Sequence, residues 1–133
     1  METPMTFKEG QPIYVQIAER LCDEVLSGTY GAGQRVPSVR EYSVLLEVNV
    51  NTTVKAYDYL AQRGVIYNRR GMGYYVADDA AARIRDERRR AFVGEELPEL
   101  FRRMALLGIS PDEVLDYWKK WSAGRPGAPP ERR

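Results

Sequence analysis

The stretch from Pro37 to Tyr57 carries two helix starts in close succession, and this spacing constrains the fold more than any other feature of the chain. Ser38 and Glu41 match a capping box, in which the serine caps the helix and the glutamate reaches back to the cap. Asn49 is a good N-cap for a second helix. Apolar residues recur at helical spacing after each cap, at Val39, Tyr42, Leu45 and Leu46 and then at Val54, Tyr57, Leu60 and Ala61. We therefore expect a helix-turn-helix.

The first turn of the second helix is polar and faces away from the predicted apolar stripe. It presents Asn51, Thr52 and Thr53, with Lys55 just beyond. Neutral donors and acceptors beside a positive charge at a helix N-terminus suit phosphates and base edges. The pattern therefore favours a nucleic-acid contact at this turn.

A further helix is predicted before the motif. Pro12 suits a first helical position, and Gly28 suits the end of the helix. With Arg20 as its only basic residue, this helix is expected to be a core scaffold rather than a groove reader. Cys22 lies on its apolar face and is expected to be a buried small hydrophobe, not a redox switch.

A hairpin is predicted directly after the helix-turn-helix. Gly64 suits a helix stop, and residues 65–76 change to a strand-like composition. Arg69, Arg70, Gly71 and Gly73 fall at the turn, where glycine permits positive φ. A basic hairpin tip beside a polar helix start is typical of a wing, whereas Arg-Arg-Gly alone would equally suit a solvated turn.

Composition excludes several classes of function. The chain has no histidine, so it lacks the commonest general base and the commonest zinc ligand. No nucleophile motif or phosphate loop is present, and we expect no enzyme activity, no metal site and no cofactor. The 20 Lys and Arg nearly balance the 19 Asp and Glu, so net charge does not announce a partner. No apolar run approaches the ~20 residues of a membrane span, which predicts a cytoplasmic protein without a membrane partner.

The C-terminal part is predicted to be a helical pair. Pro98 should kink or interrupt a long helix, Gly108 should end it, and Ser110 with Glu113 forms another capping box. Two such helices are too small to own a core, so their apolar faces call for a second copy of the chain. The residues expected in this dimer contact are Phe92, Leu97, Leu100, Phe101, Met104, Leu107, Leu115 and Trp118.

Four motifs in order resemble the winged helix of GntR-family transcription regulators, and most closely the YtrA-like subfamily. They are Pro37-Ser-Val-Arg-Glu41, Val48-Asn-Val-Asn-Thr-Thr-Val-Lys-Ala-Tyr57, Arg63-Gly-Val-Ile66 and Arg69-Arg-Gly-Met-Gly-Tyr-Tyr-Val76. The resemblance implies homodimerisation through the short helical segment. It also implies DNA contacts by Arg40, Asn51, Thr52, Lys55, Arg69, Arg70 and Gly71.

Two basic residues leave an alternative open. Arg40 could instead form a surface ion pair with Glu41 or Glu47. Arg63 lies near a helix end, where a cation often complements the helix dipole.

The sequence as a whole predicts a mainly α fold with a small β-hairpin. Residues 1–77 would form a winged helix-turn-helix, 78–123 a helical dimerisation segment and 124–133 a disordered tail. The expected function is that of a bacterial repressor that binds an inverted-repeat operator as a homodimer and so associates with the nucleoid, with recognition helices about 34 Å apart in successive major grooves. The alternatives are an effector-sensing regulator with an aromatic pocket at the dimer interface, and a winged helix that binds a protein.

Overall fold

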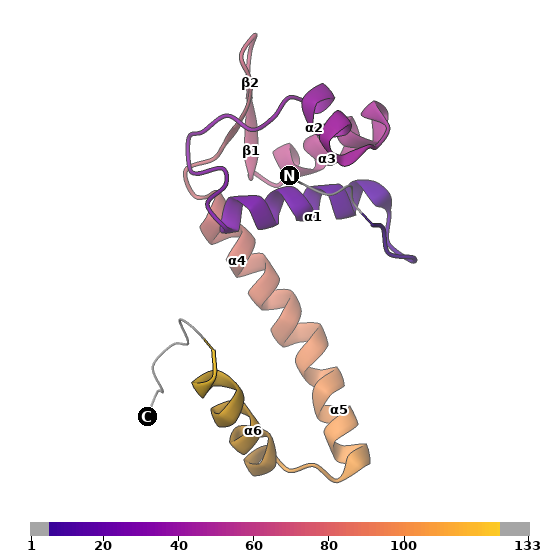
Figure 1. Cartoon of the computed structure of the whole chain (residues 1–133), viewed down its shortest axis with the longest axis vertical. Coiled ribbons are helices and arrows are strands. Elements are labelled where there is room, and N and C mark those ends of the chain that lie inside the picture. Colours follow the sequence, from indigo (N-terminus) through magenta and orange to yellow (C-terminus); the bar gives the residue numbers. More distant parts are fainter. Residues whose placement is uncertain (1–5, 126–133) are drawn as a thin grey trace. The chain divides into compact units, whose positions relative to one another are not determined.

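The computed structural model describes residues 6–125 and separates into two compact units, with the division after Arg88. The chain is mainly helical with one two-stranded sheet, which confirms the predicted fold class (Figure 1). The elements in order are α1 (Ile13–Leu26), α2 (Val39–Leu46), α3 (Val50–Gln62), β1 (Ile66–Arg69), β2 (Gly73–Val76), α4 (Ala80–Ala91), the π-helical turn η1 (Phe92–Glu96), α5 (Leu97–Leu107) and α6 (Pro111–Ala123).

The core of the first unit forms where α1 and α3 pack side by side, with α2 against α3. Ile17 and Leu21 of α1 and Tyr57 and Leu60 of α3 are buried in it. Cys22 is also buried, as its position on the apolar face predicts, and desolvation raises the pKa of its thiol to about 11. The scaffold role expected for α1 follows from this packing.

Both predicted helix caps are present in the helix-turn-helix. The backbone N–H of Ser38 donates to Glu41 Oε1 at 2.8 Å, and the N–H of Glu41 donates to Ser38 Oγ at 3.1 Å. The side chain of Asn49 accepts from the N–H of Asn51 at 2.8 Å. Between the helices, Glu47 takes the left-handed conformation with φ of 56°, which turns the chain from α2 into α3.

The buried faces of α2 and α3 differ in part from the predicted stripes. Leu45 and Val54 are exposed, whereas Ser43, Thr53 and Ala56 are buried. The inward side chains are small, and those of Ser43 and Thr53 are hydrogen-bonded to each other where α2 meets α3. The prediction of Leu45 and Val54 as core residues was therefore wrong.

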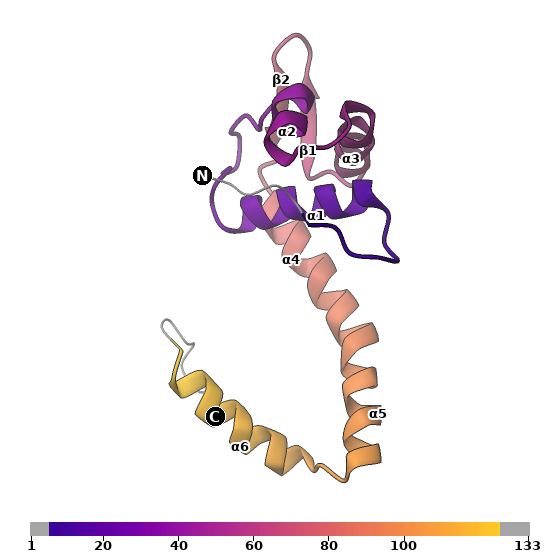
Figure 2. The same ribbon diagram turned by 45° about the vertical axis from the view of Figure 1, so that its right-hand side comes forward.

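The predicted hairpin is present as an antiparallel pair in which Ile66 faces Val76 and Arg69 faces Gly73. The segment before α2 adds a bridge, because Val36 N–H donates to the Tyr74 carbonyl at 3.0 Å and Val76 N–H donates to the Gln34 carbonyl at 2.9 Å. In both Figure 1 and Figure 2 the hairpin tip projects beyond α2. The hairpin is thus tied to the chain that enters the helix-turn-helix.

The first unit extends past the boundary at residue 77 that composition suggests. Ala80 and Ile84, one helical turn apart in α4, are buried with the core of the winged helix. The guanidinium of Arg88 pairs with Asp23 of α1 at 2.6 Å. The start of α4 therefore belongs to the winged helix, because its apolar stripe packs on that core.

The second unit contains η1, α5 and α6. The N–H of Leu97 donates to the carbonyl of Phe92, five residues back, so the chain passes through one wide π-helical turn before Pro98. Pro98 then stands in the first turn of α5, where its missing N–H is tolerated, and it does not break the helix. Gly108 ends α5 with φ of 69°, and Ser110 caps α6 by accepting from Glu113 N–H at 3.2 Å.

The predicted disordered tail lies mostly outside the described residues, which end at Arg125. Across residues 6–125, no helix has the length and apolar character needed to cross a membrane.

Candidate nucleic-acid interface

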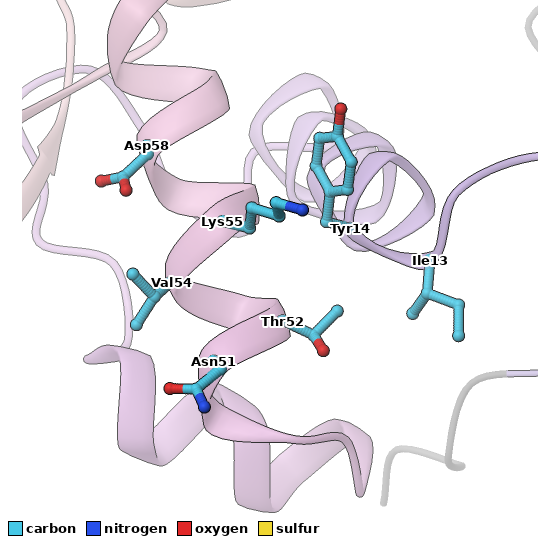
Figure 3. Close-up of a pocket in the computed structure, with 7 residues that line it drawn as sticks. All are labelled: Ile13, Tyr14, Asn51, Thr52, Val54, Lys55 and Asp58. Atoms are coloured by element: carbon cyan, nitrogen blue, oxygen red, sulfur yellow. The ribbon is translucent and has the colours of Figure 1, made fainter.

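The exposed side of α3 carries two neighbouring stripes of side chains. Figure 3 shows Asn51, Val54 and Asp58 on one side of the helix, and Thr52 and Lys55 on the side that faces α1. With Ile13 and Tyr14 of α1, these residues line an open recess of about 420 Å³. Asn51 and Lys55 are exposed and Thr52 is half-buried, so all three predicted contact residues reach this surface.

Thr53 does not reach it. Its side chain has 0% relative exposure, and its hydroxyl accepts a hydrogen bond of 2.8 Å from the hydroxyl of Ser43 in α2. The prediction that Thr53 contacts DNA through its side chain was therefore wrong. The helical period places this residue, directly after Thr52, on the inward face of α3.

Arg40 does not form the ion pair with Glu41 or Glu47 that the sequence left open as an alternative. Glu41 is occupied by the Ser38 cap and by Arg35, whose guanidinium lies 3.8 Å away. Hydrogen bonds from Ser38, with a smaller contribution from Arg35, hold the pKa of Glu41 below its usual value. Within residues 6–125 Arg40 makes no ion pair, and its exposed guanidinium remains available to a phosphate.

The wing holds its arginines differently. The guanidinium of Arg69 lies 4.8 Å from the centroid of the Tyr75 ring, and that ring stacks on Tyr67 with centroids 6.0 Å apart. Arg70 and Gly71 occupy the exposed turn, where Gly71 has φ of 75°. One arginine is therefore held on an aromatic face, and the other stands at the tip.

Arg35 joins the wing to the helix-turn-helix, a role that the sequence does not indicate. Its Nε donates to the carbonyl of Met72 in the hairpin turn at 3.1 Å, and it also faces Glu41 at the start of α2. Met72 is 37 positions away in the chain, so no local pattern could have revealed this contact. Val54 of α3 and Met72 of the hairpin turn also present exposed apolar side chains, which the sequence patterns did not predict for this surface.

Arg63 lies apart from these contacts. It pairs with Glu87 of α4 and sits over the Tyr59 ring, with its guanidinium carbon 4.8 Å from the ring centroid. Its position near the end of α3 thus supports packing of α4 on the first unit.

The chemistry of this surface suits a nucleic acid. The exposed cations Arg40, Lys55, Arg69 and Arg70 can neutralise phosphates, while Asn51 and Thr52 offer neutral donors and acceptors to base edges. In the described part of the chain, no group of three or more His, Cys, Asp or Glu side chains could hold a metal ion.

The predicted dimer residues of the second unit are mostly exposed. The exposed fractions of Leu107, Phe101 and Trp118 are 71%, 56% and 51%, and Phe92, Leu100 and Leu115 are exposed as well. Leu97 is half-buried. Met104 differs from the others, because it is buried within the chain with a relative exposure of 9%.

Leu106 and Tyr117, with exposed fractions of 73% and 63%, were not among the predicted dimer residues and add to this apolar surface.

Comparison with known proteins places this geometry in a family. The family described as "Bacterial regulatory proteins, gntR family" matches residues 13–76. An HTH-type transcriptional regulator of Bacillus subtilis, YhcF, is 31% identical over 118 residues, which cover 89% of this chain and 96% of YhcF. The B. subtilis HTH-type transcriptional repressor YtrA is 30% identical over 116 residues, which cover 87% of this chain and 88% of YtrA.

Solved structures agree with the sequence relatives. A GntR-family regulator from Bacteroides thetaiotaomicron superposes with a TM-score of 0.73 and 43% identity, over 82% of this chain and 95% of that one. The DNA-binding domain of AraR, solved in complex with the operator ORR3, has a TM-score of 0.50 and 26% identity over 58% of this chain and 93% of that one. The chain belongs to the GntR family of bacterial regulatory proteins and is a DNA-binding transcriptional regulator, not an enzyme.

Proposed function

We propose that this regulator is a homodimeric repressor that binds an inverted-repeat operator through α3 and the wing. The observation that carries the dimer is the apolar surface of the second unit, where side chains such as Leu106, Leu107, Tyr117 and Trp118 are more than half exposed. Monomers rarely leave so many large apolar side chains in water, and a second copy of the same surface covers them with closed symmetry.

The proposed DNA contacts divide into two kinds. Asn51 and Thr52 at the start of α3 read base edges in the major groove, with the exposed Val54 placed to meet a thymine methyl group. Arg40, Lys55, Arg69 and Arg70, with the backbone at Gly71, contact phosphates or the adjacent minor groove. Thr53 has no direct part in this set because its side chain is buried.

One relative supports repression, and a structural neighbour supports operator binding. The B. subtilis relative YtrA is described as a repressor, and the AraR domain was solved on an operator. A dimer seated on a promoter excludes RNA polymerase by occupying the same DNA, which needs no further activity. Such a role places the protein in the cytoplasm, at the nucleoid.

The experiment combines oligomeric state with DNA binding. Light scattering after size exclusion should give a dimer. Fluorescence anisotropy on DNA from upstream of the protein's own gene should show two chains per duplex, tighter binding than to scrambled DNA, and a steep dependence on salt. A reporter driven by the same DNA should fall when the protein is present.

A matched pair of variants tests the dimer surface. Leu107→Glu places a carboxylate on the apolar surface and should yield monomers with weakened operator binding. Lys120→Glu adds the same carboxylate at an exposed polar position of α6 and should remain dimeric. Monomeric wild-type protein, or a Leu107→Glu variant that stays dimeric, contradicts the proposed interface. A stable dimer without salt-dependent DNA binding would instead support a protein-binding winged helix.

A further inference from the structure

The ammonium group of Lys55 lies against an aromatic ring from another helix. Its Nζ is 5.2 Å from the centroid of Tyr14, in the first turn of α1. Figure 3 shows the lysine side chain extending from α3 toward this ring. A cation within about 6 Å of a ring centroid is attracted by the negative face of the ring.

The Tyr14 ring is itself held in place. It meets the ring of Tyr59, one turn after Lys55 in α3, edge to face, with centroids 5.8 Å apart and an interplanar angle of 78°. This is a preferred geometry for two aromatic side chains. Tyr14 is thus a fixed platform between α1 and α3 rather than a freely rotating side chain.

Within residues 6–125, Lys55 forms no ion pair with a carboxylate, although Asp58 is three positions away on the same helix. Figure 3 shows the Asp58 side chain pointing away from α1, on the neighbouring stripe with Asn51 and Val54. The ammonium charge of Lys55 is therefore not neutralised by an ion pair with a described residue, and it lies on the side of α3 that faces α1.

We propose that Tyr14 is a positioning residue for DNA binding, which holds the ammonium of Lys55 at the α1 side of the recess for a backbone phosphate. This inference rests on the proposed DNA contact of α3. It assigns Lys55 to affinity rather than to sequence preference, because the ring directs the charge away from the stripe of Asn51 and Val54. With the ring present, the lysine side chain has already lost rotamer freedom in the free protein. Without the ring, it must lose that freedom when it binds DNA, which weakens binding.

The test is a double-mutant cycle measured by anisotropy on operator and scrambled DNA. Tyr14→Leu removes the ring, Lys55→Met removes the charge, and Tyr14→Phe keeps the ring while removing the hydroxyl. Tyr14→Leu should weaken binding to both DNAs by about two- to fivefold when Lys55 is present, which is the range of an exposed cation–π contact. It should have little effect in the Lys55→Met background, and Tyr14→Phe should bind like the unaltered protein.

Equal effects of Tyr14→Leu with and without Lys55 would overturn the positioning role, as would a Tyr14→Phe variant as weak as Tyr14→Leu. Selective loss on the operator alone would overturn the assignment of Lys55 to phosphate. Because Tyr14 also packs on Tyr59, each variant is first shown to be folded at the assay temperature by thermal unfolding.

A measurement without DNA separates this inference from the proposed function. In the NMR spectrum of the free protein, the ε-methylene protons of Lys55 should be shifted upfield by the Tyr14 ring. The shift should persist in Tyr14→Phe and vanish in Tyr14→Leu. Its absence from the unaltered protein overturns the contact even if DNA binding is found. Its presence without any DNA binding leaves the contact standing and the proposed function refuted.

Discussion

The hydroxyl of Ser43 in α2 donates a hydrogen bond of 2.8 Å to the hydroxyl of Thr53 in α3, and both side chains are buried. This contact joins the two helices of the helix-turn-helix at their close approach. It fixes α3 against α2 while the neighbouring residues Asn51 and Thr52 face outward. Thr53, which the sequence pattern assigned to the DNA surface, thus packs inward and orients the residues beside it.

Thr53→Val should lower the free energy of unfolding by about 1 kcal/mol, because it keeps the shape of the side chain but removes the hydroxyl that accepts from Ser43 and donates a long bond of 3.4 Å to the Asn49 carbonyl. The ratio of operator to scrambled affinity should not change. Urea unfolding and anisotropy check the two halves of this prediction. A variant with normal stability and a lost operator preference would show that Thr53 reads DNA directly.

Two glycines in the wing should respond differently to a methyl group. Gly71 and Gly73 both have positive φ, of 75° and 99°, so alanine at either position costs about 1–2 kcal/mol in backbone strain. A Cβ at Gly71 meets open space, whereas a Cβ at Gly73 would lie 3.1 Å from Nε of Arg35. Gly73→Ala should therefore lower the thermal unfolding midpoint more than Gly71→Ala.

The difference between these glycine variants should depend on Arg35. In an Arg35→Ala background, Gly73→Ala should cost no more than Gly71→Ala, because the side chain that crowds the new methyl group is gone. An unchanged difference would place the cause in backbone strain alone.

Asn51 and Arg70 should separate sequence preference from affinity. Asn51→Ala should reduce the difference in binding free energy between operator and scrambled DNA by about 1–3 kcal/mol, since an amide at the start of α3 suits bidentate contact with adenine. Arg70→Ala should weaken binding to both DNAs and reduce the slope of log K against log salt by about 1. Anisotropy across a salt series measures both, and equal losses on both DNAs for Asn51→Ala would contradict the division.

The Glu41 capping box should make stability depend on pH. Hydrogen bonds from Ser38 lower the pKa of Glu41 in the folded chain, so its stabilising contribution is present above the unfolded pKa and lost as pH falls through the lower folded value. Glu41→Gln should accordingly be less stable than the unaltered protein at pH 7. The gap should narrow below about pH 4. Unfolding free energies at pH 7, 5 and 3 give the test, and a gap that does not vary with pH would show that the carboxylate charge contributes nothing.

Local patterns were sufficient for the α-helices, the hairpin and their order, whereas the π-helical turn before Pro98 was not predicted. The caps at Ser38, Asn49 and Ser110 and the glycine stops are set by interactions over three or four residues, so the sequence alone identifies them. The hairpin between Arg69 and Gly73 follows from its composition for the same reason. The family follows from these motifs in their order, and with it the function of DNA-binding regulator.

Which side chains face inward was decided by tertiary packing. Helical periodicity allows the buried stripe of α3 to be drawn through Val54 or through Thr53, and only the close approach of α2 selects the small, hydrogen-bonded threonine. The links from Arg35 to Met72 and from Lys55 to Tyr14 join residues 37 and 41 positions apart, as the numbering shows, with no local signature. The sequence by itself determined which helices and turns form. The fold decided how the exposed surface of α3 and the wing is held, because contacts between distant segments arise only when the chain is packed.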